Sequence, residues 1–327
     1  MAIPEAFFDR LAGLRFASGP ELTQFFRTRL GQDFAPWFNR HIANHDAWRD
    51  RAIPPGGVTR FPLLWNAFLA LRPCTLLEVL AYTGVFIQET GGTFLPKSEG
   101  FGNARRPGIA YLFDNFAISD SSGHSFQKAS YNTGRANRTA GSLFRDPVYN
   151  RAHKHRALSE KLAGTENPVW DGEDFPDEIF PFSGKPEETG YILEADFFKF
   201  RGRGFIQTTW RENYVKLARL VQAYGGEQPT MRRFRDAWAG LPADEVCTTS
   251  CNADWDALFQ QSDLVLPCAA VLLHAEGGKY LPLALDAATA NGTGPGSVAR
   301  MGQRINGSLD YGRLLRERIG HIAVQMG

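Results

Sequence analysis

The 327-residue chain lacks an excess of charge of either sign: 36 Lys and Arg residues stand against 35 Asp and Glu residues, for a formal net charge of +1. It has no run of Lys and Arg of the kind that follows a phosphate backbone, which argues against a nucleic-acid partner. It has no apolar run of about 18 residues, so we expect no membrane span. Residues 1–10 contain no basic segment followed by an apolar one, so we expect no cleaved signal peptide.

Cysteine is scarce, with four residues in the whole chain: Cys74, Cys247, Cys251 and Cys268. Cys247 and Cys251 lie close together, but no second Cys or His pair stands at the spacing of a zinc site. Buried thiols are the simplest interpretation, and a disulfide formed after export is the alternative.

Motifs for metal, phosphate and dinucleotide binding are also missing. There is no P-loop, no Gly-x-Ser-x-Gly and no complete Gly-x-Gly-x-x-Gly. His274 with Glu276, and His153 with His155, have no third ligand at a suitable spacing, so solvated or core histidines are expected. The acidic stretch 171–177 fits no EF-hand register. We therefore expect no metal and no cofactor.

The chain does have apolar residues at helical spacing, and its content of 43% hydrophobic residues with 25 Phe and 7 Trp is enough for a full core. From Leu63 to Ile87 this pattern predicts two helices, divided by Pro73, the second of which ends at Gly91. A further helix is predicted to start after Ser18. Alternation typical of strands is scarce, which predicts a mainly α fold. Four more helical patterns occur at residues 214–224, 231–238, 264–274 and 314–324.

Composition divides the chain into three parts. Residues 1–60 are a predicted N-terminal helical extension, broken near its end by the Pro-Pro-Gly-Gly sequence of residues 54–57. Residues 61–327 are the main predicted domain, with an insertion at about 103–197. The insertion is rich in Asn, Ser, Gly, Asp and Pro, basic in its first half and acidic in its second, and its aromatic residues argue against disorder. We expect a long irregular elaboration on one side of a helical core.

Polar uncharged side chains gather in residues 200–214. Gly202 and Gly204 permit close approach of backbone or ligand. Gln207, Thr209 and Asn213 follow at a spacing that places them on one surface, and their amide and hydroxyl groups can hold water or a polyhydroxylated substrate. The stretch predicts a sugar-binding wall that needs a carboxylate from elsewhere in the chain to do chemistry.

Glu89 is the carboxylate that best fits this role. It lies in the last turn of a predicted apolar helix, just before Gly91 and Gly92. The negative end of the helix dipole and the apolar neighbours both disfavour the ionised form, so we expect a raised pKa. A raised pKa suits a general acid that works near neutral pH. The alternative is an ordinary solvated Glu before a glycine cap.

Several short segments, in the same order, resemble the family 19 glycoside hydrolases, which are the plant-type chitinases and the related phage endolysins of the lysozyme superfamily. Each segment is weak alone, and together they cover a minor part of the chain. The resemblance implies a lysozyme-like fold with a cleft between two helical lobes, whereas residues 1–60 and 103–197 have no counterpart. The segments are Glu-Thr-Gly-Gly at 89–92, Arg-Gly-Arg-Gly-x-Ile-Gln-x-Thr at 201–209, Ser-Asp-Leu-Val at 262–265, and Arg-Ile-Asn-Gly at 304–307 with Arg-Ile-Gly at 318–320.

The resemblance implies a role for each catalytic residue. Glu89 would be the general acid, although the family's preceding His is Gln88 here. The second carboxylate would be Glu99, which follows ten residues after Glu89 as in related endolysins, or Asp114 if the loop is longer. This second group would act as a base on water, and an inverting geometry would place the two carboxyls about 6.5–9.5 Å apart. Thr209 would help to hold the water.

Four other residues match substrate-binding positions of the family. Gln207 and Asn213 would bind substrate on the near wall, and Asn306 and Arg318 would contact sugar or orient the acids on the far wall. The structural alternatives are a turn at Asn306, which precedes a glycine, and an ion pair between Arg318 and a nearby carboxylate. Tyr214 is expected to pack in the core.

These roles predict hydrolysis of a β-1,4 bond in an N-acetylated aminosugar polymer. Peptidoglycan is favoured over chitin because no signal peptide and no Cys-rich chitin-binding module are expected, and because the spacing from Glu89 to Glu99 is endolysin-like. Such a cell-wall hydrolase, an endolysin or an antibacterial effector, would be made in the cytoplasm. It would reach the periplasm or cell wall through a holin or a secretion machine, and an immunity protein or a secretion-machine component is a further expected partner. A chitinase is the first alternative, and a non-catalytic glycan-binding protein is the second.

Overall fold

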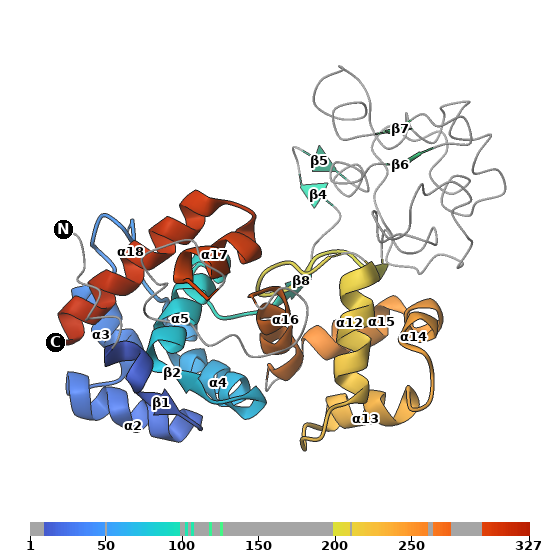
Figure 1. The fold of residues 1–327 in the computed structure, drawn as a ribbon, viewed down its shortest axis with the longest axis horizontal. Helices are drawn as coiled ribbons and strands as arrows, with labels where there is room; N and C mark the ends of the chain where they lie inside the picture. The colour runs from blue at the N-terminus through green and yellow to red at the C-terminus, as the bar shows by residue number, and fades with distance from the viewer. Residues whose placement is uncertain are drawn as a thin grey trace.

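The computed structural model describes residues 10–49, 51–98, 199–209, 211–260, 264–275 and 296–327, and the backbone of four short strands between residues 102 and 126. Helices account for most of these residues, which confirms the prediction of a mainly helical fold (Figure 1). The insertion expected at about 103–197 lies outside the described residues, apart from the backbone of those strands. No helix in the described part of the chain combines the length and apolarity needed to cross a membrane.

The helices form two groups with α16 (Val265–Ala275) between them (Figure 1). The first group is α2 (Gly19–Leu30), α3 (Phe34–His41), α4 (Pro55–Leu71) and α5 (Leu76–Thr90), joined by α17 (Val298–Asn306) and α18 (Leu309–Met326) from the end of the chain. The second group is α12 (Arg211–Gln222), α13 (Pro229–Ala237), α14 (Ala243–Thr249) and α15 (Asn252–Phe259). The four later helical patterns of the sequence overlap α12, α13, α16 and α18, whereas α14, α15 and α17 were not predicted.

The strands are antiparallel pairs of two residues each. β1 (Arg15–Phe16) pairs with β2 (Cys74–Thr75) and joins the N-terminal segment to the start of α5. β3 (Lys97–Ser98) pairs with β8 (Arg203–Gly204) and joins the segment after α5 to the stretch 200–209. The other pairs are β4 (Gly102–Asn103) with β5 (Arg106–Pro107), and β6 (Ile118–Ser119) with β7 (Ser125–Phe126).

Local signals set the helix ends where the sequence predicts them. Ser18 caps α2, and Pro73 separates α4 from α5. At the start of α5 the backbone N–H of Glu78 donates to Oγ1 of Thr75 at 3.2 Å, and the N–H of Thr75 donates to Oε2 of Glu78 at 2.7 Å, which is a complete capping box. Gly91, with φ of 61°, ends α5 in the left-handed conformation that favours glycine.

The boundary expected at residue 60 falls inside α4. Pro55 occupies the first position of this helix, where the missing N–H of proline costs no hydrogen bond, so the Pro-Pro-Gly-Gly sequence starts a helix and does not separate two units. Leu11 and Met326 belong to the same buried cluster as the centre of the chain. The described part of the first 60 residues is therefore built into the common core.

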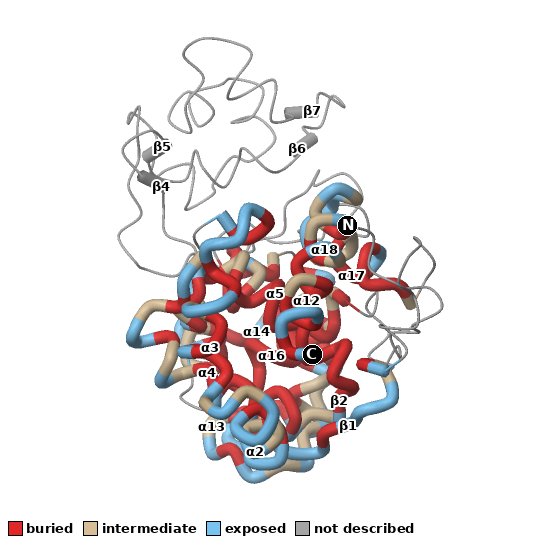
Figure 2. Tube along the Cα trace, turned by 90° about the vertical axis from the view of Figure 1, so that its left-hand side faces the viewer, coloured by how far each residue is buried: buried red, intermediate tan, exposed pale blue. Residues whose placement is uncertain are grey.

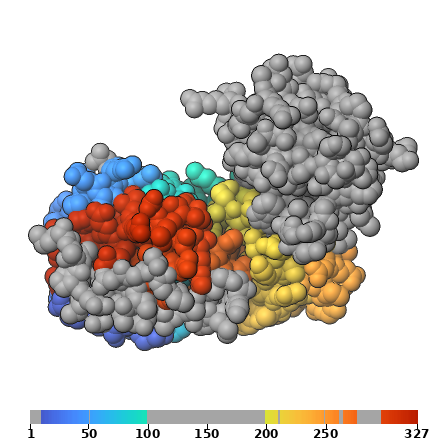
Figure 3. All heavy atoms as spheres, turned by 45° about the horizontal axis from the view of Figure 1, so that its top comes forward, coloured from blue at the N-terminus to red at the C-terminus, as the bar shows by residue number. Residues whose placement is uncertain are grey.

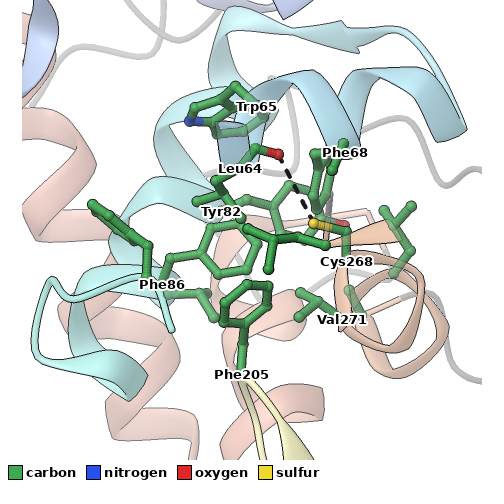
Figure 4. Close-up of a cluster of buried hydrophobic side chains, with 14 of the residues drawn as sticks. Leu64, Trp65, Phe68, Tyr82, Phe86, Phe205, Cys268 and Val271 are labelled. Carbon is green, nitrogen blue, oxygen red and sulfur yellow. Dashed lines mark hydrogen bonds between the residues drawn. The ribbon is translucent and has the colours of Figure 1, made fainter. Parts of the chain in front are cut away.

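α5 and α16 form the centre of that core. Every residue of α5 is buried except Gln88 and Glu89, and every residue of α16 is buried except His274 (Figure 2). Phe205, from the stretch 200–209, points into the same cluster and meets Phe86 of α5 with ring centroids 5.0 Å apart (Figure 4). This contact fixes the stretch 200–209 against the helix that carries Glu89.

The C-terminal helix α18 returns to the N-terminal part of the fold. Nε of Arg29 donates to the carbonyl oxygen of Met326 at 3.0 Å, and Nε of Arg318 donates to that of Ala47 at 2.7 Å. Figure 3 accordingly shows the C-terminal residues, in red, against N-terminal residues in blue. α18 and the segment before α4 therefore meet at the end of α5.

Replacing Gly57 by Ala should lower the free energy of unfolding by about 2 kcal/mol, because an added Cβ would lie 1.9 Å from the carbonyl oxygen of Gly92. That oxygen belongs to the backbone just after α5 and cannot rotate away. Gly56→Ala is the matched control, since its Cβ would meet only the mobile end of Arg60, at 2.8 Å, and should be neutral or slightly stabilising. Equilibrium urea unfolding measures both, and equal stabilities for the two variants would contradict the close contact.

Candidate active site

Glu89 lies where the sequence places it, in the last turn of α5. With Gln88 it is one of only two residues of this helix that reach solvent, and it is half-buried. Burial raises the pKa of the Glu89 carboxyl above its ordinary value, against the opposing influence of Tyr311 and Arg51. The expectation of a raised pKa is therefore met, and burial is its main cause.

The Tyr311 hydroxyl is an uncharged donor that interacts with this carboxyl. It is buried and makes no hydrogen bond of good geometry to the described residues, yet it lies near enough to Glu89 to lower the pKa of that group. Burial and the Glu89 charge raise the pKa of Tyr311 far above its usual range, so the phenol stays protonated. Tyr311 reaches this place because Gly312 lets α18 press on α17, where a Cβ would lie 1.9 Å from the carbonyl oxygen of Ala299.

Arg318 is buried and bonded to Gln88, the residue before Glu89. Its Nη1 donates to Oε1 of Gln88 at 2.7 Å, and its guanidinium lies 5.0 Å from the centre of the Trp48 ring. Burial lowers the pKa of Arg318. Arg318 thus holds Gln88 and the segment around Ala47 together, and among the described residues its side chain donates to these two and not to a carboxylate. Gln88 is engaged as an acceptor in this contact.

The stretch 203–208 forms a tight hairpin. The backbone N–H of Arg203 donates to the oxygen of Thr208 at 3.1 Å, and the N–H of Thr208 donates back at 2.8 Å. Gln207 sits in the turn with φ of 55° and is exposed, and its Nε2 is 3.4 Å from the carbonyl oxygen of Lys97. Gln207 is therefore presented to solvent beside the segment that leads to residue 99.

Thr209 and Asn213 are joined to each other. Nδ2 of Asn213 donates to the carbonyl oxygen of Thr209 at 2.8 Å, and its Oδ1 accepts from Nζ of Lys216 at 3.3 Å. Both residues are half-buried. Asn213 thus secures the start of α12, and the Thr209 side chain makes no hydrogen bond that competes with a bound water or sugar among those seen in the described residues.

Asn306 is carried by a different helix from these residues. It is the exposed last residue of α17, and Gly307 follows with φ of 82° as the helix cap. The structural alternative, a turn before glycine, describes its local geometry. The structure thus brings Arg318 to Gln88, the residue before Glu89, and groups Gln207, Thr209 and Asn213 at the hairpin.

The second carboxylate cannot be placed, since Glu99 and its alternative Asp114 both lie outside the described residues. The position of Ser98, the residue before Glu99, is nevertheless described. Ser98 pairs with Arg203 across β3 and β8, and its Oγ donates to Oδ1 of Asp256 at 3.0 Å. The residue just before Glu99 is therefore held against the hairpin.

An ionic network that the sequence did not predict lies at the base of the hairpin. Arg203 is fully buried and its Nε donates to Oδ1 of Asp256 at 2.7 Å, while Nη2 of Arg201 donates to Oδ2 at 3.0 Å. Asn252, one turn earlier on α15, accepts from both arginines. Tyr214 is buried, as expected, and its hydroxyl donates to the carbonyl oxygen of Arg201 at 2.8 Å. The spacing of Asn252 and Asp256 on one helix face was the available signal.

The cysteines and histidines in the described part of the chain form no metal-binding cluster. All four cysteines are free thiols, three of them buried and Cys251 half-buried, so the alternative of a disulfide between Cys247 and Cys251 is not found. His274 is largely buried, and burial together with the charge of Lys216 lowers its pKa to about 4. In the described residues no group of three His, Cys, Asp or Glu side chains is arranged to hold a metal. Glu276, His153 and His155 lie outside the described residues.

Comparison with protein-family models, with curated proteins and with solved structures gave no match to this chain.

Glu89→Gln should raise the free energy of unfolding at pH 7 by about 0.5 kcal/mol, a small value because the carboxyl is partly hydrated. Since burial raises the pKa in the folded state, ionisation of Glu89 costs stability at high pH. The cost is absent below the unfolded pKa of about 4.3 and appears as the pH rises through the folded value. Urea unfolding of both proteins between about pH 4 and 8 should show the two stabilities converging at the acid end. A wild type more stable than the variant at pH 7 would contradict the raised pKa.

Proposed function

We propose that the protein is a glycoside hydrolase that cleaves β-1,4 bonds of peptidoglycan, with Glu89 as the general acid. The observation that carries this proposal is the position of Glu89 at the end of a buried helix, where burial raises its pKa. A carboxyl whose pKa is raised keeps its proton to a higher pH than an ordinary Glu, and it can give that proton to the oxygen of a glycosidic bond. We propose with it a lysozyme-like fold, in which the two groups of helices are the lobes on either side of the cleft.

The neighbours of Glu89 stabilise the carboxylate that remains after proton transfer. Tyr311 and Arg51 both lower the pKa of this carboxyl, which means that they stabilise its ionised form. Burial favours the acid before the reaction, and these two groups limit the cost of the carboxylate afterwards. Arg318 holds Gln88, the adjacent residue, and so acts as a positioning residue for the end of α5.

The hairpin supplies the other half of the proposed mechanism. Thr209 would hold the attacking water, and Gln207 and Asn213 would bind substrate beside it, with Asn306 as a more distant contact. Glu99, or Asp114, would take the proton from the water. Support for Glu99 comes from the pairing of β3 with β8, which holds Ser98 next to the hairpin that carries Gln207.

An enzyme of this kind acts in the periplasm or cell wall, and we propose release through a holin or a secretion machine. An immunity protein would then be a partner of an antibacterial effector. Chitin is the alternative substrate, since the two polymers share the N-acetylated aminosugar and the β-1,4 bond. A glycan-binding protein without activity is the remaining alternative.

The test is to incubate the purified protein with peptidoglycan and, separately, with chitin oligomers, and to identify the fragments by mass spectrometry. New reducing ends from peptidoglycan are expected. Cleavage of chitin alone would show that chitin, and not peptidoglycan, is the substrate. The sugar at the new reducing end would identify the bond that is cleaved. No cleavage of either polymer, combined with measurable binding, would favour the non-catalytic alternative and reject the enzyme.

A further inference from the structure

A pocket of about 570 Å³ lies between the end of α4, the second half of α12 and α16. Its volume is in the range of small-molecule sites, which is about 300–1,000 Å³. It shares no lining residue with Glu89 and its neighbours or with the hairpin. The explanation of this pocket therefore does not depend on the proposed function.

The lining of this pocket is apolar on three sides. Leu71 at the end of α4, Leu220 on α12 and Leu273 on α16 line it, together with smaller apolar residues. Such walls favour the hydrocarbon part of a ligand, because each apolar group that leaves water there contributes to binding. A purely polar ligand would leave these walls without partners.

Two cations stand at the same pocket. Lys216 and Arg219 are one turn apart on α12 and both line it. Among the described residues that line it, Glu227 is the one carboxylate, and it is already paired with Arg232 at 2.6 Å. The Arg219 side chain makes no ion pair or hydrogen bond among the described residues. Within the described part of the chain, the charge of Arg219 therefore has no counter-ion beside this apolar surface.

Hydrogen bonds hold the residues at the rim of the pocket. Nη1 of Arg235 donates to the carbonyl oxygen of Tyr224 at 3.2 Å, and the Tyr224 hydroxyl accepts from the N–H of Gln228 at 3.3 Å. The Tyr224 ring lies so close to Gly226 that a Cβ there would be 2.4 Å from its hydroxyl oxygen. The residues 224–228 are therefore held in one conformation around the opening.

We propose that this pocket binds a small amphiphilic anion, with its hydrocarbon part against Leu71, Leu220 and Leu273 and its carboxylate or phosphate between Lys216 and Arg219. Both anionic groups accept hydrogen bonds from lysine and arginine. The two chemistries correspond to a fatty-acid-like and a phospholipid-like ligand. The shared feature is one anionic head on an apolar body.

The test uses isothermal titration of the full-length protein with four probes that share a ten-carbon chain: decanoate, decyl phosphate, decanol and decyltrimethylammonium. Saturable binding of one or both anions is expected, about tenfold tighter than decanol, with no binding of the cation. The anion that binds more tightly shows whether the ligand is fatty-acid-like or phospholipid-like. Equal binding of decanol and the anions, or no saturable binding, would overturn the proposal.

Variants locate the binding. Arg219→Gln should weaken the anions about tenfold and leave decanol unchanged, whereas Arg40→Gln, an exposed arginine on α3, should change nothing. Ala223→Phe should fill the pocket and abolish binding of every probe, with circular dichroism to show that it is folded. Anion binding that survives Arg219→Gln or a folded Ala223→Phe would place the probe elsewhere and reject the pocket.

Discussion

Replacing Glu89 by Gln should lower the rate of glycan cleavage by about 10²–10⁴-fold while the protein stays folded. The amide has nearly the same shape as the carboxyl but has no acidic proton to give to the leaving oxygen. Its surroundings need no rearrangement, because Glu89 is at the end of α5 and reaches solvent. The loss should therefore appear in kcat, with substrate binding largely kept.

The matched control is Glu245→Gln, an exposed Glu in the first turn of α14, which should cleave at the wild-type rate. The wild-type rate should also fall as the pH rises through the raised pKa of Glu89, since only the protonated form can act as the acid. Release of reducing ends from peptidoglycan measures both effects. An active Glu89→Gln variant would remove Glu89 from the mechanism.

Replacing Asp256 by Ala should lower the free energy of unfolding by about 3 kcal/mol. Arg203 has no exposed side-chain area and that of Arg201 is 7% exposed, so both would lose their counter-ion inside the protein. Removal of one partner from a buried ionic network leaves an uncompensated charge, which costs about 3–5 kcal/mol. The lower value applies because the Asp256 side chain is 26% exposed and water can reach the vacated place. Equilibrium urea unfolding measures the loss.

The control is Glu227→Ala, which removes an exposed ion pair with Arg232 and should leave the stability unchanged. Burial disfavours the Asp256 charge, but Arg203 and Arg201 outweigh burial, so its pKa is lowered. Its contribution is therefore present above the unfolded pKa of about 3.9 and is lost as the pH falls through the lower folded value. The difference between wild type and Asp256→Ala should shrink in acid. A loss below about 1 kcal/mol at pH 7 would contradict the buried network.

Much of the helical framework could be predicted because its signals are local. Ser18, Pro73 and Gly91 mark helix ends through side-chain caps and backbone angles that act within a few residues. The helices α14 and α15 are short, and their apolar residues are too few to show a period, so they were missed. The Pro-Pro-Gly-Gly sequence was interpreted as a break, but proline is equally suited to the first turn of a helix.

The candidate site was predictable in part. Glu89 could be found because a carboxylate at the end of an apolar helix is a pattern within one segment, and its raised pKa follows from that burial. Tyr311 and Arg51 could not be found, because they come from segments far away in the sequence. The resemblance to family 19 glycoside hydrolases names Glu99 and Asp114, whose positions stay a prediction.

The sequence by itself determined the mainly helical class, the start and end of α5, and the presence of one acid at its end. These depend on periodicity and capping, which act between neighbouring residues. Only the tertiary structure decided which way the side chains of the stretch 200–214 point. Arg201 and Arg203 turn inward to Asp256, while Gln207 faces solvent in the turn of the hairpin. That choice depends on a carboxylate more than 50 positions away, which no local pattern contains.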